Sequence, residues 1–167
     1  MDVNHASKLA FAPLHIKAEA DARGTPPEGF VPMPVFGPFH EHLGPMYVKR
    51  VGTSHVVGMR VEEKHRNRGQ MMHGGMICTL ADTATHWAAK HAREPILMLL
   101  TTALSVNLMG NARPGEWVEA QADVVRAGRT IVFTSCLITC AGRVVAHATA
   151  QFQVVPEQTA ATLFENA

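Results

Sequence analysis

Two adjacent glycines and one aspartate are the residues of this sequence whose types and spacing could do chemistry. Gly74 and Gly75 begin a segment with helical spacing, and Asp82 follows further along it. Glycine costs about 1 kcal/mol relative to alanine inside a helix and less in the first turn, so the pair indicates a helix start that something approaches closely. Free N–H groups at such an end attract an anion or a developing oxyanion. Alternatively, the two glycines only allow tight packing of the helix on a strand.

Asp82 lies too far into the expected helix to be stabilised by the helix dipole, and aspartate is a poor helix former. At the helical repeat of about 3.6 residues, Asp82 shares one face with Gly75, Thr79 and His86. Polar helix faces are usually solvated surface, but this one carries little charge besides a single carboxylate. Its composition fits a cleft or a subunit interface.

One long helix over about residues 73 to 92 must position these groups. Its core face is predicted by side chains that recur every three or four positions: Ile77, Leu80, Ala81, Ala84, Trp87, Ala88 and His91. Pro95 stops the helix. The sequence therefore predicts an amphipathic helix that turns Asp82 away from the core.

Runs rich in Val, Ile and Thr on both sides of the helix predict an antiparallel sheet. Residues 46 to 64 alternate, with GTS as a turn between two short strands. After the helix, the turn signals ARPGE, RAGRT and CAGRV separate four long strands of a predicted meander, at about 96 to 109, 116 to 127, 130 to 140 and 143 to 155. Wrapping this sheet around the helix buries both, which is an α+β fold. Exposed sheet edges then favour dimerisation.

Length and composition predict a single domain. The chain has 167 residues, 47% hydrophobic and 17% charged, enough for one core. We place the domain at residues 31–157, after an extension of unassigned role at 1–30 and before a tail at 158–167. The segment from residue 31 to 45 is rich in proline, so we expect it to run irregularly over the surface, anchored by Phe36, Phe39 and Leu43.

Charge, hydropathy and cysteine usage limit the function classes. A formal net charge of +1 without a Lys/Arg tract favours neither nucleic acid nor an anionic membrane as a partner. The N-terminus lacks a signal peptide's apolar core, and the most apolar run is shorter than a membrane span, so we expect a soluble protein. Of the three cysteines, Cys136 and Cys140 cannot bridge within their shared strand. We therefore expect core thiols and a reducing, cytoplasmic setting.

The pattern N.....HGG......D, formed by Asn67, His73, Gly74, Gly75 and Asp82, resembles the hotdog-fold thioesterases of the phenylacetyl-CoA thioesterase (PaaI-like) group. The similarity extends over about residues 36 to 155, through HLGPMYVK and the later order GE...A.......GRT. The resemblance implies a hotdog fold and an acyl-CoA thioesterase. It also implies no cofactor or metal, with coenzyme A as part of the substrate.

The resemblance implies a catalytic role for several residues. The Gly74 backbone N–H would bind the thioester oxygen, and Asp82 from the neighbouring subunit would act as general base or as nucleophile. Asn67 would help to place the carbonyl or the water, and His73 would orient the site. An alignment on Gly115 and Glu116 puts Thr101 at the position that holds the water in some members, although Thr102 is adjacent and a one-residue slip would exchange them.

Substrate contacts are implied at other positions. Gly75 and Thr79 lie on the Asp82 face, and Arg126, Gly128 and Arg129 in RAGRT could meet the phosphates of coenzyme A. A solvated hairpin explains those two arginines equally well, and Asn67 alone also fits a turn. Three further residues, Met71, Met72 and Met76, could line an acyl pocket or fill the core.

The predicted function is hydrolysis of a CoA thioester to the free acid and CoA by a homodimer at least, with a homotetramer expected. The alternative is a non-catalytic acyl-CoA binding module on the same fold. A hydratase on this fold would need a catalytic histidine and a different helix-entry motif. A metal site at His40 to His42 lacks further ligands at recognisable spacing. Acyl specificity, and coenzyme A against acyl-carrier protein, stay open.

Overall fold

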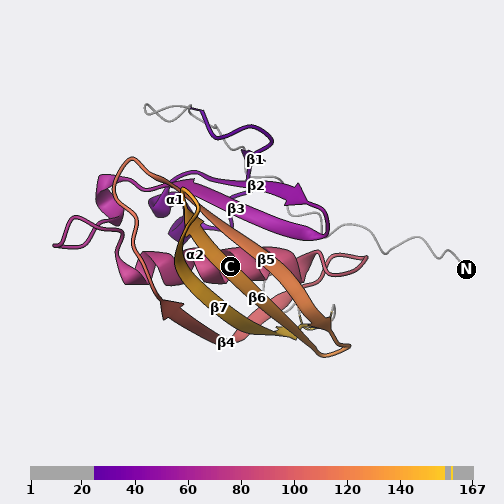
Figure 1. The fold of residues 1–167 in the computed structure, drawn as a ribbon. Coiled ribbons are helices and arrows are strands. Elements are labelled where there is room, and N and C mark those ends of the chain that lie inside the picture. The colour runs from indigo at the N-terminus through magenta and orange to yellow at the C-terminus, as the bar shows by residue number, and fades with distance from the viewer. Residues whose placement is uncertain (1–24, 157–158, 160–167) are drawn as a thin grey trace, which may run out of the picture.

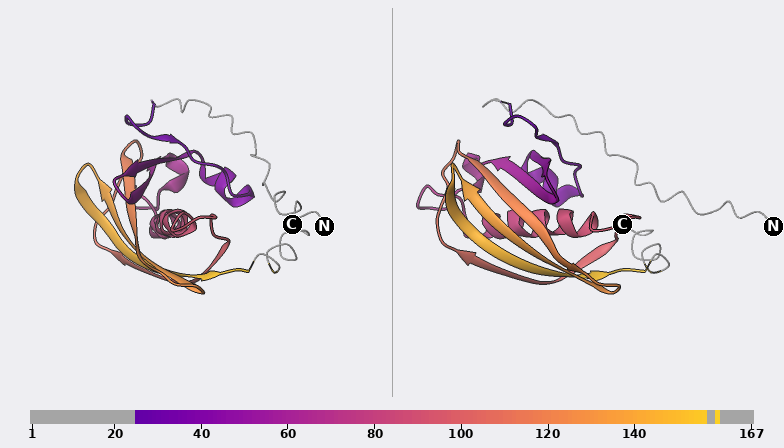
Figure 2. Two further views of the ribbon diagram at one scale, coloured as in Figure 1. Left: turned by 90° about the vertical axis from the view of Figure 1, so that its right-hand side faces the viewer. Right: turned by 45° about the vertical axis from the view of Figure 1, so that its right-hand side comes forward.

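One antiparallel sheet of seven strands curves around one long helix (Figure 1). The computed structural model describes residues 25–156 and 159, so most of the predicted extension and tail lie outside the described residues. The strands are β1 (Val31–Pro32), β2 (Met46–Val51), β3 (Ser54–Arg60), β4 (Leu99–Leu108), β5 (Trp117–Ala127), β6 (Ile131–Cys140) and β7 (Arg143–Val154). The long helix is α2 (Gly74–Lys90), and the view along its axis shows the sheet wrapped around it (Figure 2). The predicted α+β hotdog architecture is therefore confirmed.

The apolar face of α2 explains why the sheet bends around it. Of its predicted core residues, Ile77, Leu80, Ala81, Ala84 and Ala88 are buried, while Trp87 and His91 are half-buried. The small alanines bring the helix close to the facing strands, where Val57, Val118 and Ala120 are fully buried in the same cluster. Burial of this face fixes the roll of the helix, and the face that bears Asp82 is left outside the core.

The predicted meander is correct for three strands and wrong for the fourth. The strand order is β1-β2-β3-β5-β6-β7-β4, so consecutive hairpins join β5, β6 and β7, whereas β4 pairs with β7. The eight residues between β4 and β5 therefore carry the chain to the other side of the β5–β7 unit. Because β4 pairs with β7 alone among the described residues, it forms one edge of the sheet.

The proline-rich segment is more regular than predicted. It contains the short helix α1 (Pro38–Leu43), with proline at a first-turn position where no N–H partner is needed. Leu43 packs against the core, and Phe36, although partly exposed, contacts the rings of His86 and Trp87 on α2 with centroids 6.4 and 5.9 Å apart. Phe39 is exposed and does not act as the predicted anchor. A 3-10 turn, η1 (Glu63–His65), joins β3 to the entrance of α2.

Cys136 and Cys140 are buried and unbridged, in agreement with their prediction as core thiols, and Cys78 is free and half-buried. Burial raises the pKa of the Cys136 thiol to about 12. None of the helices in the described part of the chain has the length and apolar character needed to cross a membrane.

Candidate functional site

The start of α2 leaves one backbone donor available. His73 caps the helix, because its Nδ1 accepts a hydrogen bond from the Gly75 N–H at 2.9 Å. The N–H groups of Met76 and Ile77 both donate to the His73 carbonyl, at 2.9 and 3.1 Å. The Gly74 N–H has no hydrogen-bond partner among the described residues. Of the first four helical N–H groups, which cannot find partners further back in the helix, only this one lacks a partner among the described residues and is available to a ligand.

Thr101 and Asp82 lie in direct contact. The Thr101 hydroxyl donates to Asp82 Oδ1 at 3.1 Å, whereas the Thr102 hydroxyl donates to the Gln151 carbonyl at 3.1 Å. The pairing of β4 with β7 shifts register between Thr101 and Ala103, which is a β-bulge. The bulge resolves the slip that the alignment left open: Thr101, not Thr102, meets the carboxylate.

Two groups of predicted residues are separated along one helix. Gly74, Gly75 and His73 lie at its N-terminus, and Asp82 with Thr101 lies about 12 Å further along the axis at the helical rise of about 1.5 Å per residue. Thr79 lies between them, where its hydroxyl donates to the Gly75 carbonyl at 3.0 Å. One chain therefore cannot bring the Gly74 N–H and the Asp82 carboxylate to the same carbonyl group.

Asn67 forms a turn just before the helix. Its Oδ1 accepts hydrogen bonds from the N–H groups of Gly69 at 2.8 Å and Met71 at 3.3 Å. The role of Asn67 as a turn residue therefore accounts for the hydrogen bonds of its side-chain oxygen. The Asn67 amide nitrogen has no partner within the described chain, so it can still donate to a ligand.

Two histidines beside Asp82 were not predicted as part of the site. His86 follows Asp82 by one helical turn, and the edge of its ring packs on Phe152 with centroids 5.6 Å apart. His40 in α1 lies with its Nε2 at 3.3 Å from the Thr83 hydroxyl. For His86 the sequence did carry a signal, its spacing of four residues from Asp82. For His40 it did not, because the contact of α1 with α2 joins residues about 40 positions apart.

Burial favours the neutral form of both imidazoles beside the carboxylate, because it lowers their pKa. Desolvation lowers the pKa of His86, and the negative charge of Asp82 partly opposes that shift. The same two causes act, in the same order, on the pKa of His40. The Asp82 carboxylate thus accepts a hydrogen bond from Thr101 and has two histidines near it, an arrangement that a general base or a nucleophile can use.

A cavity of about 360 Å³ adjoins the helix start. It is lined by His42, Leu43, Lys64, His65, Arg66, His73, Met76 and Thr79. Two of these, His73 and Thr79, are predicted site residues, and Met76 also packs in the core, as Met72 does. The predicted acyl-lining role of Met76 and its role in the core are therefore compatible, while Met71 is half-buried outside that core cluster.

The predicted phosphate-binding arginines lie elsewhere. Arg126, Gly128 and Arg129 belong to the β5–β6 hairpin, whose Gly128 and Arg129 carbonyls accept hydrogen bonds from Arg93 at 3.2 and 3.4 Å. Arg93 follows the C-terminus of α2, and the hairpin lies at that end of the helix (Figure 1). Within one chain, the structure does not bring these arginines to Gly74 or Asp82.

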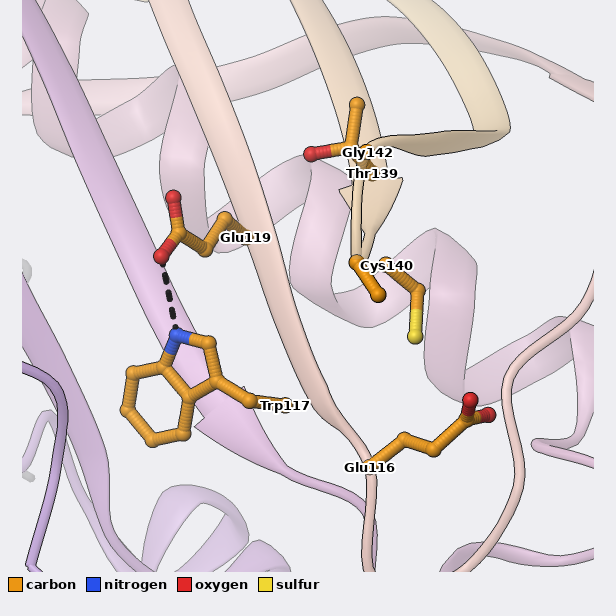
Figure 3. A pocket seen from close by; sticks show the side chains of 7 residues that line it. Glu116, Trp117, Glu119, Thr139, Cys140 and Gly142 are labelled. Atoms are coloured by element: carbon orange, nitrogen blue, oxygen red, sulfur yellow. Dashed lines mark hydrogen bonds between the residues drawn. The ribbon is translucent and has the colours of Figure 1, made fainter.

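A second cavity, of about 390 Å³, contains none of the predicted site residues (Figure 3). Its lining includes Glu116, Trp117, Glu119 and Cys140, and the Trp117 indole N–H donates to Glu119 at 3.1 Å. Within residues 25–156, no three or more His, Cys, Asp or Glu side chains are grouped so that they could hold a metal ion.

Comparison with known sequences gives one family. A family model described as the thioesterase superfamily matches residues 69–147. The Pseudomonas aeruginosa protein PA0474, named as a proposed esterase, is 35% identical over 129 residues, which are 77% of this chain and 96% of that protein. Human acyl-coenzyme A thioesterase 13 is 32% identical over 81 residues, 48% of this chain and 57% of the human protein.

Solved structures agree on the fold. Zebra fish thioesterase superfamily member 2 superposes with a TM-score of 0.65 at 28% identity, over 71% of this chain and 87% of that one. The Escherichia coli PaaI protein from the phenylacetic acid degradation operon superposes with a TM-score of 0.63 at 23% identity, over 70% of this chain and 83% of that one.

Proposed function

Because this chain belongs to the thioesterase superfamily, we propose that it hydrolyses acyl-CoA thioesters to the free acid and coenzyme A, at sites built from two copies of the chain. Membership of the superfamily confirms the prediction of a thioester hydrolase. Coenzyme A as the leaving group, the catalytic residues and the assembly belong to the proposal. Coenzyme A is supported by the similarity to acyl-coenzyme A thioesterase 13.

The observation that carries the proposal is the N–H of Gly74, which has no hydrogen-bond partner among the described residues. A thioester carbonyl oxygen placed there accepts a hydrogen bond that strengthens as the oxygen becomes negative in the tetrahedral intermediate. The absence of a Cβ at this position allows close approach. His73 supports the donor indirectly by satisfying the Gly75 N–H.

Asp82 supplies the attacking group. As a general base it takes a proton from water while the water oxygen bonds to the thioester carbon, and the C–S bond then breaks to release the CoA thiolate. As a nucleophile its carboxylate bonds to that carbon first, the C–S bond breaks to release the CoA thiolate, and water then hydrolyses the resulting anhydride to the free acid and the Asp82 carboxylate. In both routes Thr101 holds one carboxylate oxygen, so the other oxygen is free to act. Both routes stay open.

The separation of Gly74 from Asp82 supports a two-chain site. Both groups must lie within about 3 Å of the reacting atoms, yet about 12 Å of helix separates them in one chain. The unpaired edge of β4, with Leu100 and Leu108 about half exposed, is the surface through which we propose that two copies associate. A homotetramer is the larger assembly expected from the sequence.

The proposal is tested by thiol release from phenylacetyl, hydroxybenzoyl, short-chain and medium-chain acyl-CoAs. We expect wild type to hydrolyse some of them and Asp82→Asn to lose about 100-fold or more in kcat, because the amide keeps the shape but cannot act as a base or nucleophile. Asp123→Asn is the matched control. Asp123 on β5 accepts a hydrogen bond from Ser54 at 2.5 Å, and removing the charge of the acceptor weakens that bond, so Tm should fall while kcat stays unchanged.

Two outcomes would contradict the proposal in different ways. Equal turnover by Asp82→Asn and wild type would remove Asp82 from the mechanism. Binding of CoA esters without turnover by wild type would favour the non-catalytic acyl-CoA binding module.

A further inference from the structure

The cavity beside the start of α2 adjoins the proposed catalytic surface, and the proposed hydrolysis assigns no role to it. It shares His73 and Thr79 with the proposed catalytic surface and extends from there to η1 and α1. Two cations, Lys64 and Arg66, form part of its lining. A substrate whose thioester carbonyl contacts Gly74 therefore has a hollow with basic side chains immediately beside it.

The frame of this cavity is rigid at the level of the backbone. His65 is buried; its Nδ1 accepts from the Glu62 N–H at 2.9 Å, and its Nε2 donates to the Leu43 carbonyl at 2.7 Å. The His65 carbonyl in turn accepts from the His73 N–H at 2.8 Å. Lys64 and Arg66 thus flank a residue that joins α1, η1 and the cap of α2, so their backbones keep a fixed position relative to Gly74.

The two cations are available to an anionic ligand. Lys64 pairs with Glu62 at 3.3 Å and Arg66 with Glu63 at 2.6 Å, and three of these four side chains are at least a third exposed. Exposed ion pairs contribute little to stability, so exchanging a glutamate for a phosphate costs little. The planar guanidinium of Arg66 suits two phosphate oxygens, and the Lys64 ammonium suits a single charge.

We propose that this cavity binds the phosphate-bearing end of the pantetheine arm, with Lys64 and Arg66 as the phosphate contacts. The inference rests on the proposed function, because it takes the thioester to lie at Gly74. It is an alternative to the predicted contacts at Arg126 and Arg129, which lie at the other end of α2 within one chain. The phosphates of coenzyme A and the phosphopantetheine of an acyl-carrier protein share this chemistry.

The test compares two thioesters of the same acyl group, acyl-CoA and acyl-pantetheine, which lacks the phosphates. For the double variant Lys64→Gln, Arg66→Gln we expect KM for acyl-CoA to rise about tenfold with kcat little changed, as expected for lost ground-state contacts to charged groups. KM for acyl-pantetheine should stay the same. The difference between the thioesters should also shrink in wild type as salt increases, because the contacts are exposed.

Matched variants separate this role from a general effect of charge. Lys49→Gln, Arg50→Gln removes the same charge from β2, outside the cavity, and should leave both KM values unchanged. Glu62→Gln, Glu63→Gln frees the two cations and should lower KM for acyl-CoA alone. The same measurement is repeated with acyl-carrier protein thioesters. If the Lys64, Arg66 variant raises KM for these more than it raises KM for acyl-CoA, phosphopantetheine is the source of the phosphate.

Three results would overturn the inference. An equal rise of KM for acyl-CoA and acyl-pantetheine would show a structural role, and a selective effect of Arg126→Gln, Arg129→Gln instead would place the phosphates at the hairpin. Titration calorimetry with free coenzyme A and with pantetheine makes the same comparison without turnover. If wild type and the Lys64, Arg66 variant bound coenzyme A with equal affinity, the cavity would be rejected as the phosphate site even for an inactive protein. If wild type hydrolysed no thioester but still bound coenzyme A more tightly than the variant does, only the proposed function would be rejected.

Discussion

At the scale of single residues, α2 begins with a cap that satisfies some donors and leaves one available. The His73 ring accepts a hydrogen bond from the Gly75 N–H, and the His73 backbone carbonyl accepts from the next two N–H groups. A Ser or Asp cap would satisfy N–H groups of the same first turn, but an imidazole also adds a ring to the wall of the adjacent cavity. One capping residue thus leaves the Gly74 donor available and also forms part of the cavity wall.

The Gly74 donor can be removed without breaking the helix. Proline is well tolerated at the first helical position and lacks an N–H, and His73 has φ −64° and ψ 137°, a conformation that suits the residue before proline. We expect Gly74→Pro to lose about 100-fold or more in kcat, as when an oxyanion donor is removed. Gly74→Ala is the control, because it adds a Cβ that would meet Leu108 Cδ1 at 3.1 Å but keeps the N–H.

The measurement is kcat for both variants, with helix content by circular dichroism. Comparable kcat values for Gly74→Pro and Gly74→Ala would show that the N–H does not serve the reaction. A large loss in both would show that the added carbon itself prevents turnover, either through its contact with Leu108 or by blocking the approach of the thioester.

Residue types and spacing predicted the site only where the chemistry is local. The Gly–Gly start of the helix and the exposed face of Asp82 followed from helix geometry, and Asn67, His73 and Thr101 followed from the family resemblance. His40 beside Thr83 was missed, because that contact depends on how α1 folds back on α2. The separation of Arg126 from Gly74 likewise depends on the sheet topology.

At the scale of elements, β4 combines an open edge with a bulge at the proposed catalytic surface. The bulge lies between Thr101 and Ala103, and it lets Thr101 reach Asp82 while Thr102 bonds to the partner strand. In a regular strand the side chains alternate between the two faces of the sheet, with no extra residue such as the one in this bulge. The helix and six longer strands were predictable within a few residues from their periodicity, whereas the pairing of β4 with β7 is non-local and leaves no pattern in the sequence.

Gly58 in β3 shows how closely the elements on the other side of the sheet pack. A Cβ at this position would lie 2.4 Å from the Trp117 ring and 2.9 Å from the Phe30 ring, which themselves stack edge to face at 5.1 Å. We expect Gly58→Ala to destabilise the fold by about 1–3 kcal/mol, because the indole must leave a packed position. Urea denaturation of wild type and variant measures this difference.

The steric cause of that loss has its own control. Trp117→Leu shortens the side chain that the new methyl group would strike, so Gly58→Ala should cost less in that background than in wild type. Strict additivity of the two changes would place the cost of Gly58→Ala outside the contact with Trp117.

At the scale of the whole molecule, the proposed chemistry needs more than one chain. Each chain carries both half-sites, Gly74 with Asn67 at the helix start and Asp82 with Thr101 further along, yet they are too far apart to serve one carbonyl. A two-fold dimer is the simplest assembly that gives each Gly74 an Asp82, because a self-complementary interface makes two equivalent sites. The edge of β4 is suited to such an interface because its backbone groups on one side lack partners among the described residues.

Mixing two inactive variants tests this assembly. If each site takes Gly74 from one chain and Asp82 from the other, a heterodimer of Gly74→Pro with Asp82→Asn has one doubly damaged site and one intact site. Random exchange of equal amounts makes about half of the dimers mixed, so we expect about a quarter of wild-type activity to return. The readout is thiol release after refolding the variants together, with mixed dimers counted by native mass spectrometry. If Gly74 and Asp82 of the same chain acted together, every mixed dimer would contain only damaged sites, and no activity would return however many formed.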